Sequence, residues 1–226
     1  MKNIEALISD SEQMIRGYYS VYNSTDIFEF HKLEEKSSLL IVIDMNNGFA
    51  KKGSLSSPRV QHLIPKIELL TFKCLDNNIH TVAITDHHKD HAKEFASYAP
   101  HCIIGSDEEK LVDELLKFND HSYFHTIQKN STNGFHVFNP FDEFKLLEME
   151  YIENIIITGC VTDICVYQYA LSLLTYINEH SLSTKVILPI NMTDTFDAPS
   201  HDGDLINLLY LNSLKSNGIL LVSDII

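Results

Sequence analysis

Short runs of aliphatic residues alternate along the chain with longer segments in which apolar residues recur at helical spacing. A continuous aliphatic run is typical of a strand that is buried on both faces, and the longer pattern indicates a helix with one buried face. The run at residues 38–44 and shorter apolar stretches predict six strands, at residues 38–44, 79–85, near 123–129, 154–159, 184–190 and 218–223. The segments between them predict helices near residues 60–74, 108–117, 141–151, 163–179 and 202–216.

This order of elements predicts the fold class. Strands separated by helices of this length form right-handed βαβ units, whose parallel sheet is covered on both faces. We therefore expect an α/β fold of three layers, Rossmann-like, with a six-stranded parallel sheet flanked by helices. Residues 38–226 are expected to form this domain, and residues 1–37 precede it as an N-terminal extension.

The extension has an apolar pattern of its own. Its apolar residues recur at roughly helical spacing, at Ile4, Leu7, Ile8, Ile15, Tyr18, Tyr19 and Tyr22. Part of the extension is therefore expected to be an amphipathic helix. The sequence leaves two uses for its apolar face open: it covers the core of the domain, or it contacts another subunit.

Composition and charge narrow the class of protein. The chain has 226 residues with 17 Lys and Arg against 31 Asp and Glu, a formal net charge of −14, which argues against nucleic acid or an anionic membrane as the partner. The longest unbroken aliphatic run, residues 39–43, is far too short to span a membrane, and the first residues lack the apolar stretch of a secretory signal. The four cysteines include no CxxC pair, which indicates free thiols in a reducing compartment. We expect a cytoplasmic protein.

Polar side chains stand where the predicted strands end. Asp44 ends the first strand, Asp86 follows the second, Lys129 ends the third, and Cys165 lies in the first turn of the helix after the fourth. The loops at the carboxyl ends of parallel strands converge on one crevice, so these four side chains are expected to meet. Each alone is compatible with a structural role, as a turn residue, a solvated lysine or a packed cysteine. A catalytic and a structural interpretation are therefore both kept.

Cys165 has a physical reason to be reactive. Backbone N–H groups at the start of a helix favour anions and lower the pKa of a thiol, and a nearby lysine acts in the same direction. A carboxylate could then accept the thiol proton, and the turn at residues 159–163 could direct backbone N–H groups at an oxyanion. Cys102 and Cys160 are weaker candidates for a nucleophile.

The loop after the second strand contains four of the twelve histidines of the chain. Two imidazoles together with carboxylates suit Zn or Fe(II), and to a lesser degree Mn. A solvated polar loop is the structural alternative. The candidate metal ligands are Asp86, His88, Glu94 and His101, with His87 and His91 as possible substitutes in any such set.

Four strings of residues, in this order, resemble the isochorismatase-like cysteine hydrolases: IVIDMNNGF, YAPHCIIGS, QKNSTNGF and GCVTDICV. The nicotinamidases are the most similar members, because PHCIIGS with an upstream Asp-x-His is typical of their metal site. The resemblance spans about residues 38–226 and includes TFDAPSHD after the fifth strand. It departs from the family after the first strand, where the usual D-x-Q is Asp44-Met45-Asn46.

The resemblance implies roles for individual residues. The family's catalytic triad carries over onto Asp44, Lys129 and Cys165. A non-proline cis peptide bond is expected between Cys160 and Val161, and the oxyanion hole would be the backbone N–H groups of Val161 and Cys165.

The same resemblance implies the ligands and the pocket. The metal ligands fall on Asp86, His88, Glu94 and His101 and hold one divalent transition metal, Zn or alternatively Fe or Mn. Phe49 and Tyr98 are candidates for the wall of the substrate pocket, with core packing as the alternative.

The implied reaction is hydrolysis of nicotinamide to nicotinate and ammonia through a thioester, as part of NAD salvage, with the metal binding the pyridine nitrogen. True isochorismatases lack the nucleophilic cysteine, so Cys165 argues against that activity. Two alternatives stay open: a related cysteine hydrolase of another small amide or carbamoyl compound, and a non-catalytic binding protein with the same fold. Because family members are often oligomers, a homo-oligomer is expected.

Overall fold

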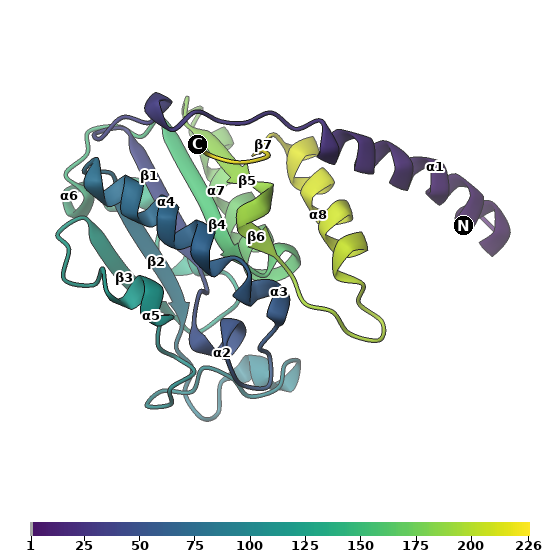
Figure 1. The fold of residues 1–226 in the computed structure, drawn as a ribbon, viewed down its shortest axis with the longest axis horizontal. Coiled ribbons are helices and arrows are strands. Elements are labelled where there is room, and N and C mark those ends of the chain that lie inside the picture. The colour runs from purple at the N-terminus through teal and green to yellow at the C-terminus, as the bar shows by residue number, and fades with distance from the viewer. Residues whose placement is uncertain (1) are drawn as a thin grey trace.

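The six predicted strands lie side by side in one parallel sheet (Figure 1). The computed structural model describes residues 2–226, apart from the side chain of Lys145. The order of the strands across the sheet is β3-β2-β1-β4-β5-β7. Their bounds are β1 Ser38–Ile43, β2 His80–Asp86, β3 Phe124–Lys129, β4 Asn154–Cys160, β5 Lys185–Pro189 and β7 Leu220–Val222. The predicted α/β class and the flanked parallel sheet are confirmed.

A seventh strand, β6, escaped prediction. It comprises only Thr193–Asp194 and pairs in parallel with the end of β4, with Thr193 opposite Gly159 and Asp194 opposite Cys160. Two residues are too few to establish an alternating or continuous apolar pattern. This pairing nevertheless fastens the segment after β5 to the turn that carries Cys165.

Both faces of the sheet are covered by helices, which explains why a central strand such as β1 is a continuous aliphatic run. Leu40 and Val42 of β1 face the layer that contains α4 (Ile64–Asp76). Leu39 and Ile41 face the opposite layer, which contains α7 (Tyr167–Glu179) and α8 (Gly203–Asn217). Because successive side chains of a strand point to opposite faces, one strand serves two hydrophobic cores.

Several helices are shorter than predicted. The predicted helix at 60–74 is divided into α3 (Pro58–Gln61) and α4, with a proline in the first turn of each, where a missing N–H costs nothing. The predicted helix at 108–117 contains only α5 (Asp113–Leu116), and that at 141–151 contains only α6 (Phe144–Leu147). Glu148, at a φ of 50°, ends α6 in the left-handed region. A short helix that was not predicted, α2 (Asn47–Ala50), follows β1.

The extension contains one long helix, α1 (Ile4–Asn23), which begins where the Asn3 side chain accepts a hydrogen bond from the Ala6 N–H. It packs on α8 and extends past it, away from the sheet (Figure 1). Ile4 and Ile8 are 62% and 57% exposed, and no described residue of α1 is fully buried. Within residues 2–226, no helix combines the length and apolar character that crossing a bilayer requires.

The backbones of β1 and β4 come very close at Gly159. Gly159 has a φ of +107°, and a Cβ added there would lie 1.9 Å from the carbonyl oxygen of Ile43. That oxygen belongs to the central strand and cannot move aside as a flexible side chain could. Only glycine therefore fits at the end of β4, directly before the turn that carries Cys165.

We expect Gly159→Ala to lower the free energy of unfolding by at least about 3 kcal/mol, because the left-handed backbone and the contact with Ile43 both oppose a side chain. Urea unfolding followed by circular dichroism measures this loss. Gly17→Ala is the matched control, since nothing lies within 4 Å of a Cβ at Gly17 in the middle of α1. That variant should be neutral or more stable by up to about 1 kcal/mol. Wild-type stability of Gly159→Ala would contradict the expectation.

Candidate active site

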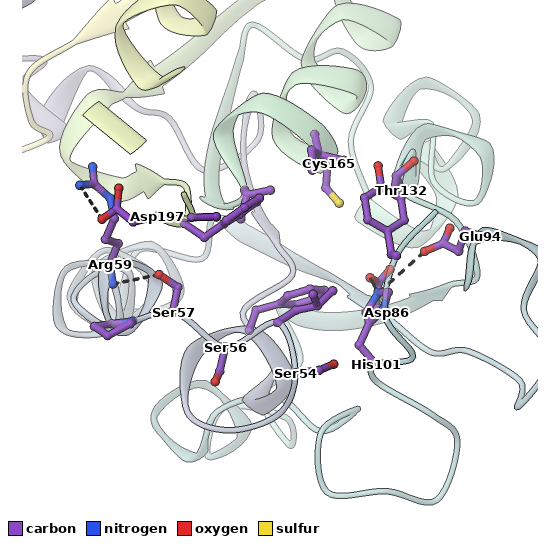
Figure 2. A pocket seen from close by; sticks show the side chains of 18 residues that line it. Ser54, Ser56, Ser57, Arg59, Asp86, Glu94, His101, Thr132, Cys165 and Asp197 are labelled. Atoms are coloured by element: carbon purple, nitrogen blue, oxygen red, sulfur yellow. Dashed lines mark hydrogen bonds and ion pairs between the residues drawn. The ribbon is translucent and has the colours of Figure 1, made fainter. Parts of the chain in front are cut away.

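A cavity of about 550 Å³ opens at the carboxyl ends of the central strands (Figure 2). Cys165 points into it from the turn after β4, and Asp86 reaches it from the end of β2. Lys129, at the end of β3, and Asp44, directly after β1, lie buried behind these residues and contact them. The side chains that the strand ends predicted to meet are therefore brought together in the structure.

Lys129 links the other polar groups of this site. Its Nζ lies 2.8 Å from Asp44 Oδ2 and 3.9 Å from Cys165 Sγ, and it donates a short hydrogen bond to Asp86 Oδ1. The side chains of Asp44, Asp86 and Lys129 are at most 1% exposed. Asp44 has a φ of 52°, a left-handed conformation that aspartate tolerates better than most residues. One buried ammonium thus lies between two carboxylates and within reach of a thiol.

Burial decides the protonation of this group. Desolvation, reinforced by the neighbouring Asp86 carboxylate, raises the pKa of Asp44 to about 7, although Lys129 opposes the shift. Burial alone would lower the pKa of Lys129, but the interactions with Asp44, Cys165 and Asp86 outweigh it and raise that pKa well above its usual value. A carboxyl group whose pKa lies near neutrality suits a general base, because it can both accept and return a proton.

The sequence predicted a lowered pKa for Cys165, and this prediction is wrong. Burial raises the pKa of the Cys165 thiol well above its usual value, and the attraction of Lys129 offsets only part of the effect. A hydrogen bond to Asp44 favours the protonated thiol further. Cys165 is therefore a thiol rather than a thiolate in the resting protein, and Asp44 is the carboxyl group beside it.

The turn before the candidate nucleophile has an unusual backbone. The peptide bond between Cys160 and Val161 is cis, as expected. The predicted helix at 163–179 begins with a single π-helical turn, Thr162–Val166, and continues as α7. Val161 and Cys165 both line the cavity in which a substrate carbonyl would lie. Cys160 faces away, because its thiol donates a hydrogen bond to the Asp44 carbonyl at 3.0 Å.

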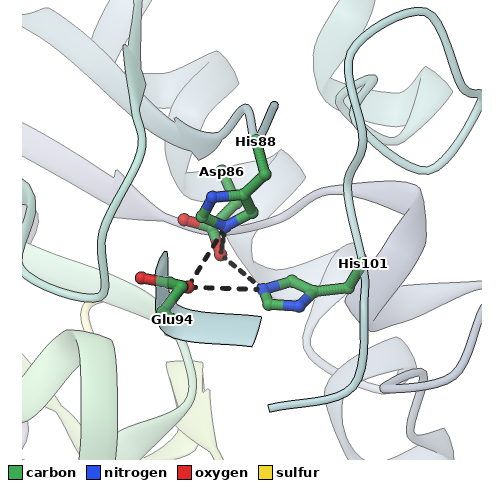
Figure 3. Close-up of side chains that lie close together, drawn as sticks. All are labelled: Asp86, His88, Glu94 and His101. Atoms are coloured by element: carbon green, nitrogen blue, oxygen red, sulfur yellow. Dashed lines mark hydrogen bonds and ion pairs between the residues drawn. The ribbon is translucent and has the colours of Figure 1, made fainter. Parts of the chain in front are cut away.

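Beside the thiol, four side chains converge on one point (Figure 3). Asp86 Oδ2 lies 3.3 Å from His88 Nε2 and 3.2 Å from His101 Nε2. Glu94 Oε1 lies 3.3 Å and 3.8 Å from the same two nitrogens, and one ligand atom from each of the four residues falls within 4.8 Å of the others. His88 Nε2 and Glu94 Oε1 are buried without a hydrogen-bond partner, which is what a metal-binding group without its ion should show.

The outer nitrogens of both imidazoles are held in place. His88 Nδ1 donates to Asn130 Oδ1 at 3.0 Å, and His101 Nδ1 donates to the Ala99 carbonyl at 2.8 Å. Because these acceptors require a proton on Nδ1, Nε2 is the nitrogen that each imidazole would offer to a metal at the centre of the group, as in metal sites generally. The residues present therefore fit a divalent transition metal. His87 contacts Glu109 instead, and His91 is exposed, so neither of these alternatives joins the group.

Comparison with known proteins now identifies the family. Residues 38–175 match the isochorismatase domain. The chain belongs to the isochorismatase family. Nicotinamidase 1 from Arabidopsis thaliana is 28% identical to this isochorismatase-family hydrolase over 174 residues, which cover 72% of this chain and 71% of that protein.

Solved structures of similar fold include proteins with different substrates. The pyrazinamidase of Pyrococcus horikoshii in complex with zinc has a TM-score of 0.66 at 21% identity and covers 82% of this chain and 98% of its own. The N-carbamoylsarcosine amidase from Thermoplasma acidophilum has a TM-score of 0.65 at 18% identity. The match covers 82% of this chain and 95% of that protein. Both share the fold of this isochorismatase-family chain.

The structure places the two predicted wall residues of this isochorismatase-family protein on the cavity. Phe49 lines it with its ring centroid 5.4 Å from that of His101, and Tyr98 lines it with partial exposure. Sequence reasoning missed the rest of the wall, above all residues 54–57 between α2 and α3, residues 58–59 at the start of α3 and residues 196–198 after β6. These segments are too short and irregular to show a periodic pattern, and only their place in the fold brings them to the cavity.

Proposed function

We propose that this isochorismatase-family protein is a metal-dependent cysteine amidohydrolase that converts nicotinamide to nicotinate and ammonia. The observation that carries the proposal is the shared cavity. A thiol with its base and a four-residue metal-binding group border the same space, and Lys129 contacts both Asp44 and Asp86. Nicotinamide offers a carboxamide for the thiol and a ring nitrogen for a metal. The similarity to a nicotinamidase supports this choice.

The first half of the reaction forms a thioester. Asp44 accepts the thiol proton while Sγ of Cys165 attacks the carboxamide carbon. The backbone N–H groups of Val161 and Cys165 hold the oxyanion that develops on the carbonyl oxygen. When the tetrahedral species collapses, the C–N bond breaks and Asp44 returns the proton to the departing ammonia. Lys129 remains charged throughout and holds Asp44 against the thiol.

The second half consumes one water. Asp44 removes a proton from the water as its oxygen attacks the thioester carbon, and the same N–H groups hold the second oxyanion. The C–S bond then breaks, nicotinate leaves, and the proton on Asp44 restores the thiol. Asp86, His88, Glu94 and His101 would hold a divalent metal, zinc, iron or manganese, that supplies a Lewis acid for the ring nitrogen of the substrate.

The charge of the pocket favours a neutral substrate over a carboxylated carbamoyl compound. Arg59 is the described arginine on the cavity wall, and its guanidinium contacts Asp194 at 2.9 Å, Asp204 at 2.7 Å and Asp197 at 3.6 Å. Lys129 is buried between two carboxylates. Among the described lining residues, no cation is therefore left to pair with a substrate carboxylate.

Ammonia release from nicotinamide by the purified, zinc-loaded protein tests the proposal. We expect a kcat of about 1 s⁻¹ or more, the ordinary range for enzymes, and a kcat/KM at least about 100-fold lower for N-carbamoylsarcosine, whose carboxylate finds no unpaired cationic side chain. Faster hydrolysis of N-carbamoylsarcosine would overturn the choice of substrate but leave the cysteine hydrolase. Absence of turnover on a broad panel of small amides would favour a binding protein instead.

A further inference from the structure

The segment after β6, residues 195–202, forms one side of the cavity and is referred to as the Phe196 loop. Phe196, Asp197 and Ala198 line the cavity from this loop. In Figure 2, Asp197 lies across the cavity from Asp86 and Glu94, so the loop borders the side remote from the metal-binding group. A substrate held by its ring at the metal-binding group and by its amide at Cys165 would extend any further substituent toward this loop.

Asp163 fastens the Phe196 loop from within. It belongs to the same turn as Cys165, and its side chain is 8% exposed. Its Oδ1 accepts a hydrogen bond from Thr195 Oγ1 at 2.6 Å, and its Oδ2 accepts one from His201 Nε2 at 3.0 Å. Asp163 therefore hydrogen-bonds to residues near both ends of the loop, Thr195 and His201, from the turn that carries the candidate nucleophile.

His201, which is bound to Asp163, in turn contacts both the backbone and the ring of Phe196. Its Nδ1 donates to the Phe196 carbonyl at 2.9 Å, and its ring stacks on the Phe196 ring with 4.0 Å between centroids and 8° between planes. Both ring nitrogens face oxygens that can only accept, so the imidazole carries two protons and a positive charge beside Asp163. A stacked, charged imidazole attracts the aromatic face and fixes its tilt.

The outer side of the loop is fastened as well. The Asp197 side chain accepts a hydrogen bond from the Gly203 N–H at 2.8 Å and contacts Arg59. Ala198 and His201 exchange two backbone hydrogen bonds of 2.9 Å. Within the loop, the backbone is thus closed by its own pairing, and the ring of Phe196 has little freedom to turn away from the cavity.

We propose that Asp163 and His201 are positioning residues that hold Phe196 as the wall opposite the metal-binding group, and that Phe196 thereby limits the size of the acyl group that reaches Cys165. The inference rests on the proposed amidohydrolase function for its kinetic test. It assigns neither residue to the chemical step. Truncating Phe196, or releasing it by changing His201 or Asp163, should admit larger substrates in the same way.

The kinetic test compares a single-ring amide, nicotinamide, with a two-ring amide, quinoline-3-carboxamide. We expect Phe196→Ala to raise the kcat/KM ratio of the larger to the smaller amide by at least about tenfold, as for other pockets that exclude by size. His201→Gln and Asp163→Asn should raise the same ratio. The double variant Phe196→Ala with His201→Gln should match Phe196→Ala alone, because His201 acts through that ring.

The matched control is His180→Gln. His180 also stacks on an aromatic ring, that of Tyr176 at 4.1 Å, and bonds the Tyr176 carbonyl, but it lies at the far end of α7. In His180→Gln, the kcat/KM ratio of the larger to the smaller amide, referred to as the size ratio, should equal that of the wild type. A size ratio unchanged in His201→Gln and Asp163→Asn, or effects of Phe196→Ala and His201→Gln that multiply independently, would overturn the inference.

A second readout does not depend on the substrate of the enzyme. Iodoacetamide and its larger N-naphthyl derivative alkylate a thiol by displacing iodide, and mass spectrometry measures the rate at Cys165. We expect the alkylation rate of Cys165 by the larger reagent, divided by its rate with the smaller reagent, to rise about tenfold in Phe196→Ala and in His201→Gln. This rate ratio should not change in His180→Gln. If no amide is hydrolysed by the wild type, the proposed function fails, and this ratio still decides the inference.

Discussion

Cys165→Ala is expected to lower kcat for ammonia release from nicotinamide by at least about 10⁴-fold, because covalent catalysis has no route without the sulfur that attacks the carboxamide. Its Sγ lies in the cavity and within 3.9 Å of the Lys129 ammonium. Ammonia release by the zinc-loaded variant measures the loss. Thermal unfolding and metal content should stay close to those of the wild type, since the substitution removes one atom and no metal ligand.

The matched control removes a different buried thiol. Cys74 lies in α4, is free and fully buried, and is absent from the cavity lining. Cys74→Ala should keep its turnover within a few-fold of the wild type. Turnover by Cys165→Ala within tenfold of the wild type would refute the assignment of the nucleophile, whatever the substrate. Loss of activity in Cys74→Ala with intact folding would show that thiol loss by itself, and not the site, explains the effect.

The second large effect is expected at the metal-binding group. Asp86→Ala combined with His88→Ala removes two of four converging ligands, and the protein should lose its bound metal. Elemental analysis gives the metal content per chain. Added zinc should raise the midpoint of thermal unfolding of the wild type after chelation and should leave the double variant unchanged, because only a ligand that binds the native state stabilises it.

Two neighbouring histidines provide the control. His87 contacts Glu109, and His91 is exposed, although both lie in the same loop as His88. His87→Ala combined with His91→Ala should keep its metal content and its response to zinc. Equal metal content in the two double variants would place the metal elsewhere in the protein.

Local sequence patterns were sufficient to predict the architecture. The predicted strands became six parallel strands of one sheet. The central ones, such as β1, are continuous aliphatic runs because a strand buried on both faces requires apolar residues at every position. The general rule that loops converge at the carboxyl ends of parallel strands then brought Asp44, Lys129 and Cys165 into one expected site. Their contacts in the structure follow from that topology.

The tertiary structure alone decided which neighbours those residues acquired. Sequence spacing left His87, His88 and His91 as rival ligands, and only the path of the loop turned His88 inward. The pKa of Cys165 is raised instead of lowered, because burial outweighs the attraction of a lysine that also contacts two carboxylates. Burial depends on everything packed around a group, and no local pattern reports it.

In the extension and in the Phe196 loop too, the sequence predicts local structure and packing determines the contacts. The apolar spacing of residues 4–22 predicted a helix, and its course along α8 and beyond came only from packing. The string TFDAPSHD has no assignable role in the sequence alone, because His201 contacts Asp163, which lies 38 positions earlier in the chain. The sequence by itself thus determined the elements, the sheet and the ends of strands where chemistry gathers. Contacts between distant residues, and the burial that sets their charges, arose only when the chain was packed.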